Sequence, residues 1–453
     1  MSLMYLSSYL KAKNQKTNII DKNVEIAAVK NLSSQHWYIK NLFSDIGEYK
    51  PDIIGITLFS RELKQIAELC ELIKKEFKSV TIVLGGPHPT AMPQETLEQI
   101  QACDFVVRGE GEIPLYELIE SLSHNRPLHK VKGLSFRTNT GQKFHHCSDA
   151  EIISDLDTLP FPDRESVIYN YKNKTYSSFV YGSPCDILMT SRGCPFHCHF
   201  CFKVCAKYRS RSPENVLREI DWIVDNISPS HIQIMDDSFT IQRERAIKIL
   251  DGLIEKNYPI RFKVRSRVSA VDAELLRKMK QAGINTVVYG LESGSQYMLD
   301  CFNKRTSVEQ NLAACRMTRK AGLSCLGDMI LFYPGENRQT LKETEQFIKT
   351  ARPTAVKFYV LTPLPQTKVY EEAKKNGSLV GDWGIGKETP WVKLKEFRNR
   401  REMEKIAKKM FIKTLLSPFR IFWILQFYGK SFIRNPSLAL RMCFYSFWKK
   451  KRY

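Results

Sequence analysis

Alternating strands and helices in the second half of the chain constrain its fold more than any other feature. Between residues 185 and 376, six short apolar segments each precede a stretch with helical periodicity. The predicted strands are Ile187–Thr190, Ile232–Asp236, Phe262–Arg265, Thr286–Tyr289, Gly327–Leu331 and Val356–Leu361. Six such units favour a partial, TIM-like (β/α)6 barrel of parallel strands, whose reactive groups gather at the carboxyl ends of the strands.

A cysteine-rich loop follows the first of these strands. It reads SRGCPFHCHFCFKVC from residue 191, and Cys194, Cys198 and Cys201 are spaced C-x3-C-x2-C. Thiolates are soft ligands, and iron–sulfur clusters are the usual centres of cysteine-only sites. Because a cubane cluster has four irons, three cysteine ligands would leave one iron open to a small molecule. The spacing therefore predicts a 4Fe-4S cluster.

A zinc knuckle or a disulfide pair is the alternative interpretation of this loop. Structural zinc sites need four ligands, and Cys205, His197 or His199 could supply the fourth. On the cluster interpretation Cys205 is a bystander, since a fourth protein ligand would block the open iron.

The C-x3-C-x2-C spacing, with Phe200 directly before Cys201, resembles the signature of radical S-adenosylmethionine (SAM) enzymes. That resemblance implies that the open iron binds SAM. It also implies that reductive cleavage of SAM yields a 5′-deoxyadenosyl radical, which abstracts hydrogen from a substrate.

Chemically useful residues follow the other predicted strands. Asp236 and Asp237 follow the second strand, where an acid could bind a cationic ammonium group such as that of SAM. The alternative is that either acid caps the next turn. The phrases MDDSFT, SRVSAVD, GLESGS, YPGE and TPLPQT resemble radical SAM domains that follow cobalamin domains. By that resemblance, the residues that contact SAM are Phe200, Asp236, Arg267 and Glu292. No side chain outside this set stands out as a general acid or base.

Residues 1 to about 125 also alternate between helix and strand, which favours a doubly wound (Rossmann-like) parallel sheet. The expected strands are Thr17–Asp21, Asp52–Leu58, Val80–Leu84 and Phe105–Val107. Glycine-rich turns follow the last two strands, and ligands bind such sheets at the carboxyl ends of the strands.

This half resembles the cobalamin-binding domain found ahead of many radical SAM domains. The phrases DIIGITL, VLGGPHPT and VVRGEGE carry the likeness, which places cobalamin at Gly85, Gly86, Gly109 and Gly111. There is no D-x-H-x-x-G motif, so no histidine is offered to cobalt. The first strand of the family is absent, so either the true start lies upstream, the gap is filled another way, or the cobalamin site is degenerate.

Two further regions complete the expected organisation. Residues 126–184 form a connection that contains a hairpin at Gly133–Phe144. Residues 377–453 form a basic, mostly helical region, which could bind an anionic membrane surface or cap the barrel. The chain carries 69 basic and 48 acidic residues, for a net charge of +21. No nucleic-acid partner is expected, because no known binding module accompanies this charge.

The sequence thus predicts a cytoplasmic radical SAM enzyme, with peripheral contact at the inner membrane surface as one of the two interpretations of its basic C-terminal region. It would act on a hydrophobic or natural-product substrate by cobalamin-assisted methylation or ring formation, with flavodoxin or ferredoxin as electron donor. The layout resembles the group containing the anaerobic magnesium-protoporphyrin ester cyclase. The alternatives are a radical SAM enzyme with a degenerate cobalamin domain, and a non-catalytic iron–sulfur or zinc protein that binds membrane or nucleic acid.

Overall fold

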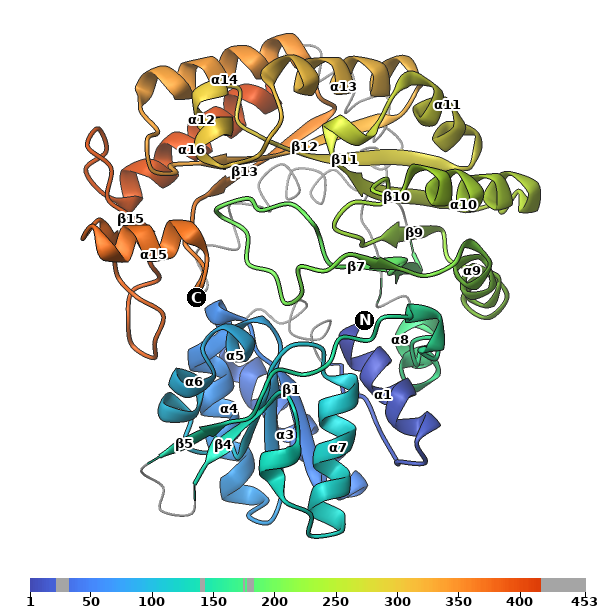
Figure 1. Ribbon diagram of the computed structural model, residues 1–453, viewed down its shortest axis with the longest axis vertical. Coiled ribbons are helices and arrows are strands. Elements are labelled where there is room, and N and C mark those ends of the chain that lie inside the picture. The colour runs from blue at the N-terminus through green and yellow to red at the C-terminus, as the bar shows by residue number, and fades with distance from the viewer. Residues whose placement is uncertain (22–31, 139–142, 174–175, 177–182, 417–453) are drawn as a thin grey trace.

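The computed structural model describes residues 1–21, 32–138, 143–173, 176 and 183–416. Figure 1 shows two α/β halves, with the N-terminal sheet and its helices below and the larger parallel sheet above. The cysteine-rich loop lies between the two halves. Both expected α/β units are therefore present.

The N-terminal sheet has five strands in the order β1-β2-β3-β4-β5. Its parallel part consists of β1 (Ile53–Thr57), β2 (Thr81–Gly85) and β3 (Phe105–Val107). The antiparallel pair β4 (Leu134–Arg137) and β5 (Phe144–His146) forms the predicted hairpin and extends the sheet beyond β3. Helices of this half are α1 (Ser2–Ala12), α3 (Leu32–Tyr49), α4 (Leu63–Glu76), α5 (Pro87–Ala91), α6 (Pro93–Gln99) and α7 (Glu112–Ser123).

The predicted strand at Thr17–Asp21 is wrong. Residues 15–21 have no regular secondary structure, and Thr17 to Ile20 line a cavity instead. A strand forms only where another strand satisfies its backbone groups. Among the described strands, β1 pairs with β2 alone, and residues 17–21 do not pair with its free edge.

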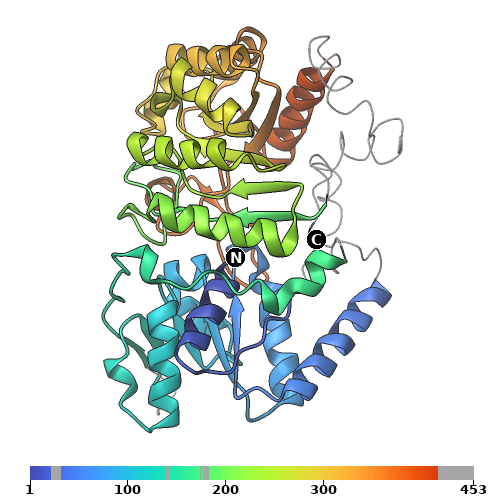
Figure 2. The same ribbon diagram turned by 90° about the vertical axis from the view of Figure 1, so that its right-hand side faces the viewer.

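The second sheet contains six parallel strands that follow one another in sequence order. They are β6 (Cys185–Leu188), β9 (His231–Ile234), β10 (Arg261–Ser266), β11 (Ile284–Glu292), β12 (Ser324–Leu331) and β13 (Ala355–Val360). The first and last strands, β6 and β13, do not pair, so the barrel is open on one side. All six predicted strands are confirmed, and the curved sheet appears edge-on in Figure 2.

Six predicted helices connect or follow these strands. They are α9 (Pro213–Ile227), α10 (Arg243–Lys256), α11 (Ala273–Gln281), α13 (Val308–Lys320), α14 (Arg338–Ala351) and α15 (Lys368–Lys375). The short helix α12 (Gln296–Cys301) was not expected.

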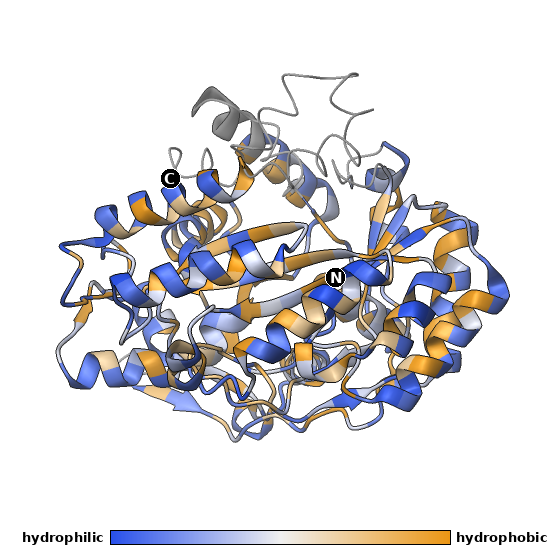
Figure 3. Cartoon of the chain, turned by 90° about the horizontal axis from the view of Figure 1, so that it is seen from above, coloured by the Kyte–Doolittle hydropathy of each residue, from blue (hydrophilic) through white to orange (hydrophobic). Residues whose placement is uncertain are grey.

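Helix α9 shows why these segments are helical. The Ser212 hydroxyl accepts a hydrogen bond from the Asn215 backbone N–H, and Pro213 occupies the first turn, where its missing N–H costs nothing. Ile220, Ile223 and Ile227 recur at helical spacing and are buried against the sheet. Figure 3 shows hydrophobic and hydrophilic stretches alternating along the helices.

The described part of the C-terminal region, residues 377–416, contains a short β pair and one long helix. A small antiparallel pair, β14 (Leu379–Val380) with β15 (Trp391–Val392), leads into α16 (Arg400–Leu415), which packs along β13. The rest of the predicted membrane-binding region, residues 417–453, lies outside the described residues. Within the part of the chain that is described, no helix is both long and apolar enough to span a bilayer.

A buried ionic cluster fastens the connecting segment to the barrel. The fully buried Arg164 places Nε 2.6 Å from Asp186 Oδ2 on β6 and Nη1 2.7 Å from Glu219 Oε1 on α9. Arg211 also pairs with Glu219, and the Tyr171 hydroxyl donates to Asp186 at 2.6 Å. Every charge in this cluster has a partner, as burial of charge requires.

Replacing Arg164 with Met tests this cluster. Removing Arg164 takes away the cation shared by two buried carboxylates, so that Asp186 keeps the Tyr171 hydroxyl and Glu219 keeps Arg211. The free energy of unfolding should therefore fall by about 3–5 kcal/mol. Urea denaturation followed by circular dichroism measures the change. The control Lys64→Met breaks an exposed pair with Glu68, at 3.9 Å, and should change stability by less than about 0.5 kcal/mol. Equal effects of the two substitutions would contradict the role of the cluster.

Candidate functional site

The cysteine-rich loop is held open by a short two-stranded ribbon at the carboxyl end of β6. The arms of the ribbon are β7 (Ser191–Arg192) and β8 (Arg209–Ser210), which pair antiparallel. Gly193 begins the loop with φ +82°, and a Cβ atom at this position would run into the carbonyl oxygen of Lys207. The local fold therefore requires glycine where the loop leaves the ribbon.

The three predicted cluster ligands converge in the structure. Cys194, Cys198 and Cys201 all line one cavity. Burial raises the pKa of the Cys201 thiol to about 11, and the charges of Cys198, Asp237 and Cys194 add to this rise, which places the three thiols close together. Three thiols of one loop at the edge of a cavity are suitable ligands for a 4Fe-4S cluster whose fourth iron binds a small molecule.

The zinc alternative needs a fourth ligand beside the three cysteines. In the described part of the chain, no three His, Cys, Asp or Glu side chains converge on a point that could hold a single metal ion. His199 is engaged elsewhere, since its Nδ1 lies 3.0 Å from the carbonyl oxygen of Cys301. A four-iron cluster is wider than one ion, so it needs ligands that are near one another without meeting at a point.

The loop docks on the segment that follows α12. Phe200 packs edge-on against Phe302 with ring centroids 5.6 Å apart, and Asn303 Nδ2 donates to the carbonyl oxygen of His197 at 2.7 Å. The guanidinium of Arg267 lies 3.6 Å from the ring centroid of Phe196, and one of its N–H groups donates to the Lys304 carbonyl. Strand ends and loop thus hold one another in place.

Asp236, which was predicted to contact SAM, and its neighbour Asp237 occupy different environments. Asp236 is buried and accepts hydrogen bonds from the N–H groups and hydroxyls of Thr190 and Ser191. The neighbouring Asp237 lines the cavity and is accessible to solvent there. The surrounding cavity walls still remove part of its hydration, and this desolvation, followed by the charge of Asp236, raises the pKa of Asp237. The structure thus commits Asp236 to the base of the cysteine loop and presents Asp237 to the cavity.

Glu292 ends β11 in an unusual conformation. Its φ is +60°, in the left-handed region, and its carboxylate lies 2.8 Å from Lys304 Nζ. Both side chains are at least nine-tenths buried and both line the cavity. Backbone strain of this kind persists only where the surroundings enforce it, and it concentrates at functional sites.

The glycine turns of the N-terminal sheet open into the same cavity, which has a volume of about 3,370 Å³. Gly86 has φ +101°, and a Cβ there would lie 3.0 Å from Thr57 Cγ2. Gly109 has φ +80° and open space where its Cβ would be. Gly85 and Gly111 also line the cavity. Backbone without side chains at the ends of β2 and β3 leaves room for a large flat ligand.

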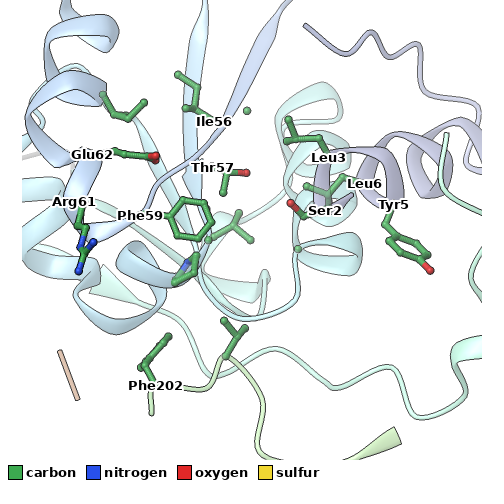
Figure 4. A pocket seen from close by; sticks show the side chains of 18 of the residues that line it. Ser2, Leu3, Tyr5, Leu6, Ile56, Thr57, Phe59, Arg61, Glu62 and Phe202 are labelled. Atoms are coloured by element: carbon green, nitrogen blue, oxygen red, sulfur yellow. The ribbon is translucent and has the colours of Figure 1, made fainter. Parts of the chain in front are cut away.

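Apolar side chains complete this part of the cavity. Figure 4 shows Thr57, at the end of β1, and Phe59, just after it, opposite Ser2 and Leu3 of α1, with Phe202 of the cysteine-rich loop on another side. Phe59 is 51% exposed, which is unusual for a phenylalanine unless a ligand covers it. These residues fit the apolar faces of a corrin ring.

The described residues that line the cavity include no histidine. His88, in the GGPHPT turn, is buried, and its Nδ1 lies 2.9 Å from Ser60 Oγ. Burial lowers the pKa of its imidazole to about 4, so this side chain is neutral at pH 7.

A cluster of ion pairs joins the two halves beside the cysteine-rich loop. Glu110, in the turn after β3, contacts Arg209 at 2.7 Å and Arg192 at 3.5 Å. Glu112 pairs with Arg192 at 2.7 Å. Arg192 and Arg209 face each other on β7 and β8, directly beside the loop. We call Glu110, Glu112, Arg192 and Arg209 the inter-domain clamp.

Two family models match this chain. The model of the radical SAM superfamily matches residues 188–348, and the model of the B12 binding domain matches residues 1–119. An uncharacterised methyltransferase of Pyrococcus horikoshii is 32% identical over 388 residues, which are 83% of this chain and 82% of that protein. The chain belongs to the B12-binding radical SAM proteins.

Other relatives extend the comparison. The anaerobic magnesium-protoporphyrin IX monomethyl ester cyclase of Cereibacter sphaeroides is 30% identical over 344 residues, which cover 74% of this radical SAM protein and 55% of the cyclase. The fold also matches the cobalamin-dependent radical enzyme OxsB (TM-score 0.74, 21% identity, 91% of this chain and 68% of OxsB). A second match is the methyltransferase TsrM of Kitasatospora setae (TM-score 0.69, 18% identity, 84% and 75%). The cofactors of this family are a 4Fe-4S cluster, SAM and cobalamin.

Sequence reasoning missed the inter-domain clamp of this radical SAM protein. The GEGE phrase was interpreted only through its glycines, Gly109 and Gly111, whereas its two carboxylates hold the arms of the cysteine loop. The sequence did hold a signal for these ion pairs. Two arginines flank the cysteine motif, and two acids follow another predicted strand of the same chain.

Replacing Gly193 with Ala should prevent the cysteine-rich loop from closing. The new methyl group overlaps the Lys207 carbonyl, and alanine disfavours φ +82°. We expect a folded protein that retains less than half of the wild-type iron after anaerobic reconstitution. Gly377→Ala is the matched control, because Gly377 has φ +71° with open space around its Cβ position. Equal iron content in the two variants would contradict this account of the loop.

Replacing Glu110 with Gln should weaken the junction between the two halves. Burial raises the pKa of Glu110, but the hydrogen bond from Arg209 and the charge of Arg192 outweigh it, so the net pKa is lowered from the usual 4.5. The stabilisation is therefore complete above about pH 4.5 and is lost as the pH falls through the lowered pKa.

At pH 7 we expect the variant to lose about 2–3 kcal/mol of stability, and the difference from wild type should shrink on acidification. Thermal unfolding at several pH values measures this. Glu151→Gln, which removes an exposed partner of Lys132, should change little at any pH. A difference for Glu110→Gln that does not depend on pH would contradict the clamp.

Proposed function

We propose that this protein binds a 4Fe-4S cluster through Cys194, Cys198 and Cys201, and uses it to cleave SAM and modify a small organic substrate with the help of cobalamin. One observation carries the proposal: the cysteine loop, the carboxyl ends of the barrel strands and the glycine turns of the N-terminal sheet all open into one cavity. A substrate in that cavity would have access to both cofactors.

We assign SAM to the surface beside the cysteine loop. Arg267 is held over Phe196 and presents a fixed positive charge at the end of β10. Asp237, rather than the fully hydrogen-bonded Asp236, presents a carboxylate that suits the amino group of SAM. Glu292 and Lys304 offer an oriented ion pair at the end of β11, which suits ribose hydroxyls. Phe200 holds the loop against Phe302.

We assign cobalamin to the turns at Gly85, Gly86, Gly109 and Gly111, with Leu3, Leu6 and Phe59 against its ring. When bound, the cluster supplies the electron that cleaves SAM, and cobalamin supplies a carrier for a methyl group. The chain contributes binding and orientation, and its phenylalanines exclude water from the reaction space.

Methyl transfer is the first candidate reaction and ring formation the second. Names of relatives support both, since the Pyrococcus protein is called a methyltransferase and the Cereibacter protein a cyclase. The reaction needs a low-potential electron donor, and we propose flavodoxin or ferredoxin. If the cobalamin site is degenerate, SAM cleavage persists and the reconstituted protein shows no corrinoid absorbance.

Replacing Cys198 with Ala should abolish both the cluster and SAM cleavage. We expect the wild-type protein to bind roughly four irons per chain and to form 5′-deoxyadenosine from SAM and reductant. The control Cys205→Ala removes a nearby thiol of the same loop and should retain both properties. One zinc per chain without deoxyadenosine would overturn the proposal, as would cleavage that survives in Cys198→Ala. SAM labelled in its methyl group then distinguishes methyl transfer from ring formation.

A further inference from the structure

Helix α16 forms one wall of the cavity and turns a basic stripe towards it. Arg401, Lys405 and Lys408 follow at intervals of four and three residues, so they lie on one face of the helix, and all three line the cavity. The helix runs beside β13 at the open side of the barrel, as Figure 2 shows at the upper right. The stripe therefore borders the route between the barrel and the N-terminal half.

A further arginine faces this stripe from the other half. Arg61 follows β1, lines the same cavity and donates to Thr362 Oγ1 at 3.1 Å, which places it beside the end of β13. Burial and then the charge of Arg400 lower the pKa of Arg61, which shows that the two guanidinium groups lie near each other. Like charges are thus brought together from two parts of the chain.

Several of these cations lack an acidic partner. Within the described residues, no carboxylate lies within 4.0 Å of Arg61, Arg401 or Lys405, and the carboxylate of Glu404 is taken up by Arg400 at 3.2 Å. Elsewhere in the cavity the pattern differs, since Arg192, Arg265 and Lys304 all pair with acids. Glu62 and Glu404 also line the cavity, but neither lies within 4.0 Å of the first three cations, which therefore remain able to bind an anion.

The adjoining wall of the barrel carries two large apolar side chains among charged ones such as Lys357 and Arg265. Tyr359 on β13 and Met235 after β9 line the cavity and are 48% and 39% exposed. Large apolar side chains exposed inside a cavity mark a surface that a ligand covers. The space beside the cofactors thus combines exposed apolar side chains with a basic rim.

We propose that the substrate of this radical SAM protein is an amphiphilic small molecule, with an apolar body against Tyr359 and Met235 and a phosphate or carboxylate group held by Arg61, Arg401 and Lys405. This inference rests on the proposed function, because it assumes that the cavity is the reaction space.

Binding of matched amphiphiles tests the substrate class. The probes are dodecyl phosphate, dodecanoate and dodecyltrimethylammonium, each below its micellar concentration, titrated into the reconstituted full chain with cluster and cobalamin but without reductant. We expect at least one anionic probe to bind roughly tenfold more tightly than the cationic probe, and less tightly as salt rises. Tighter binding of the phosphate assigns a phosphate substrate, and tighter binding of dodecanoate assigns a carboxylate.

Charge reversal on α16 locates the binding site. Lys405→Glu or Arg401→Glu should weaken binding of the anionic probe roughly tenfold. Lys409→Glu makes the same change one position beyond the stripe, at an exposed residue that does not line the cavity, and should leave binding unchanged. Equal effects of Lys405→Glu and Lys409→Glu, or equal affinity for anionic and cationic probes, would overturn the proposal.

Failure of this inference can be told apart from failure of the proposed function. Formation of 5′-deoxyadenosine by the wild-type protein tests SAM cleavage without any probe. Probe binding without reductant tests the basic rim without any cleavage. If the protein cleaves SAM but binds anionic and cationic probes with equal affinity, only the proposed substrate class is overturned.

Discussion

The carboxylate of Glu110 lies between two guanidinium groups, and the arrangement of the whole site depends on that contact. Arg192 and Arg209 flank the cysteine loop on opposite arms of its ribbon, so one acid from the N-terminal sheet fixes both arms at once. All three side chains are largely withdrawn from water, where ion pairs are stronger but also costly to leave incomplete. A contact of this kind sets the position of the cysteine loop relative to the glycine turns, because Glu110 itself belongs to one of those turns.

The same logic explains the second ionic cluster of the molecule. Arg164 belongs to the segment between the two sheets, and it reaches Asp186 on the first barrel strand and Glu219 on the first barrel helix. Met4 and Tyr171 pack into the barrel core beside it, so α1 and the connecting segment are bound to the barrel as well as to the N-terminal sheet. The two halves are therefore held together on the side of the cavity where the loop begins.

Sequence periodicity predicted the barrel well because each strand–helix unit carries its own signal. Val264 and Val287 are buried where alternation places them, and Ser212 and Asp272 cap the helices that they precede. The strand predicted at Thr17–Asp21 was wrong for the opposite reason. Whether this segment forms a strand depends on pairing with another strand, and local sequence does not show that partner. The three cysteines could be predicted from spacing. The resemblance selected Asp236 as the SAM contact, but it could not show that Asp236 accepts hydrogen bonds from the Thr190 and Ser191 backbone, because only the fold decides which carboxylate lies there.

The surroundings of helix α16 could not be predicted from its sequence pattern either. A basic amphipathic helix has the same pattern whether its charges face water, an anionic bilayer or an internal cavity. Its apolar residues Met403, Ala407 and Met410 are buried, which fixes the rotation of the helix, and that rotation carries Arg401 and Lys405 to the cavity. Lys413 on the remaining face pairs with Glu345 of α14. The same helix thus carries cations that pair with acids, such as Arg400 and Lys413, and cations that line the cavity with no carboxylate of the described residues within 4.0 Å, such as Arg401 and Lys405.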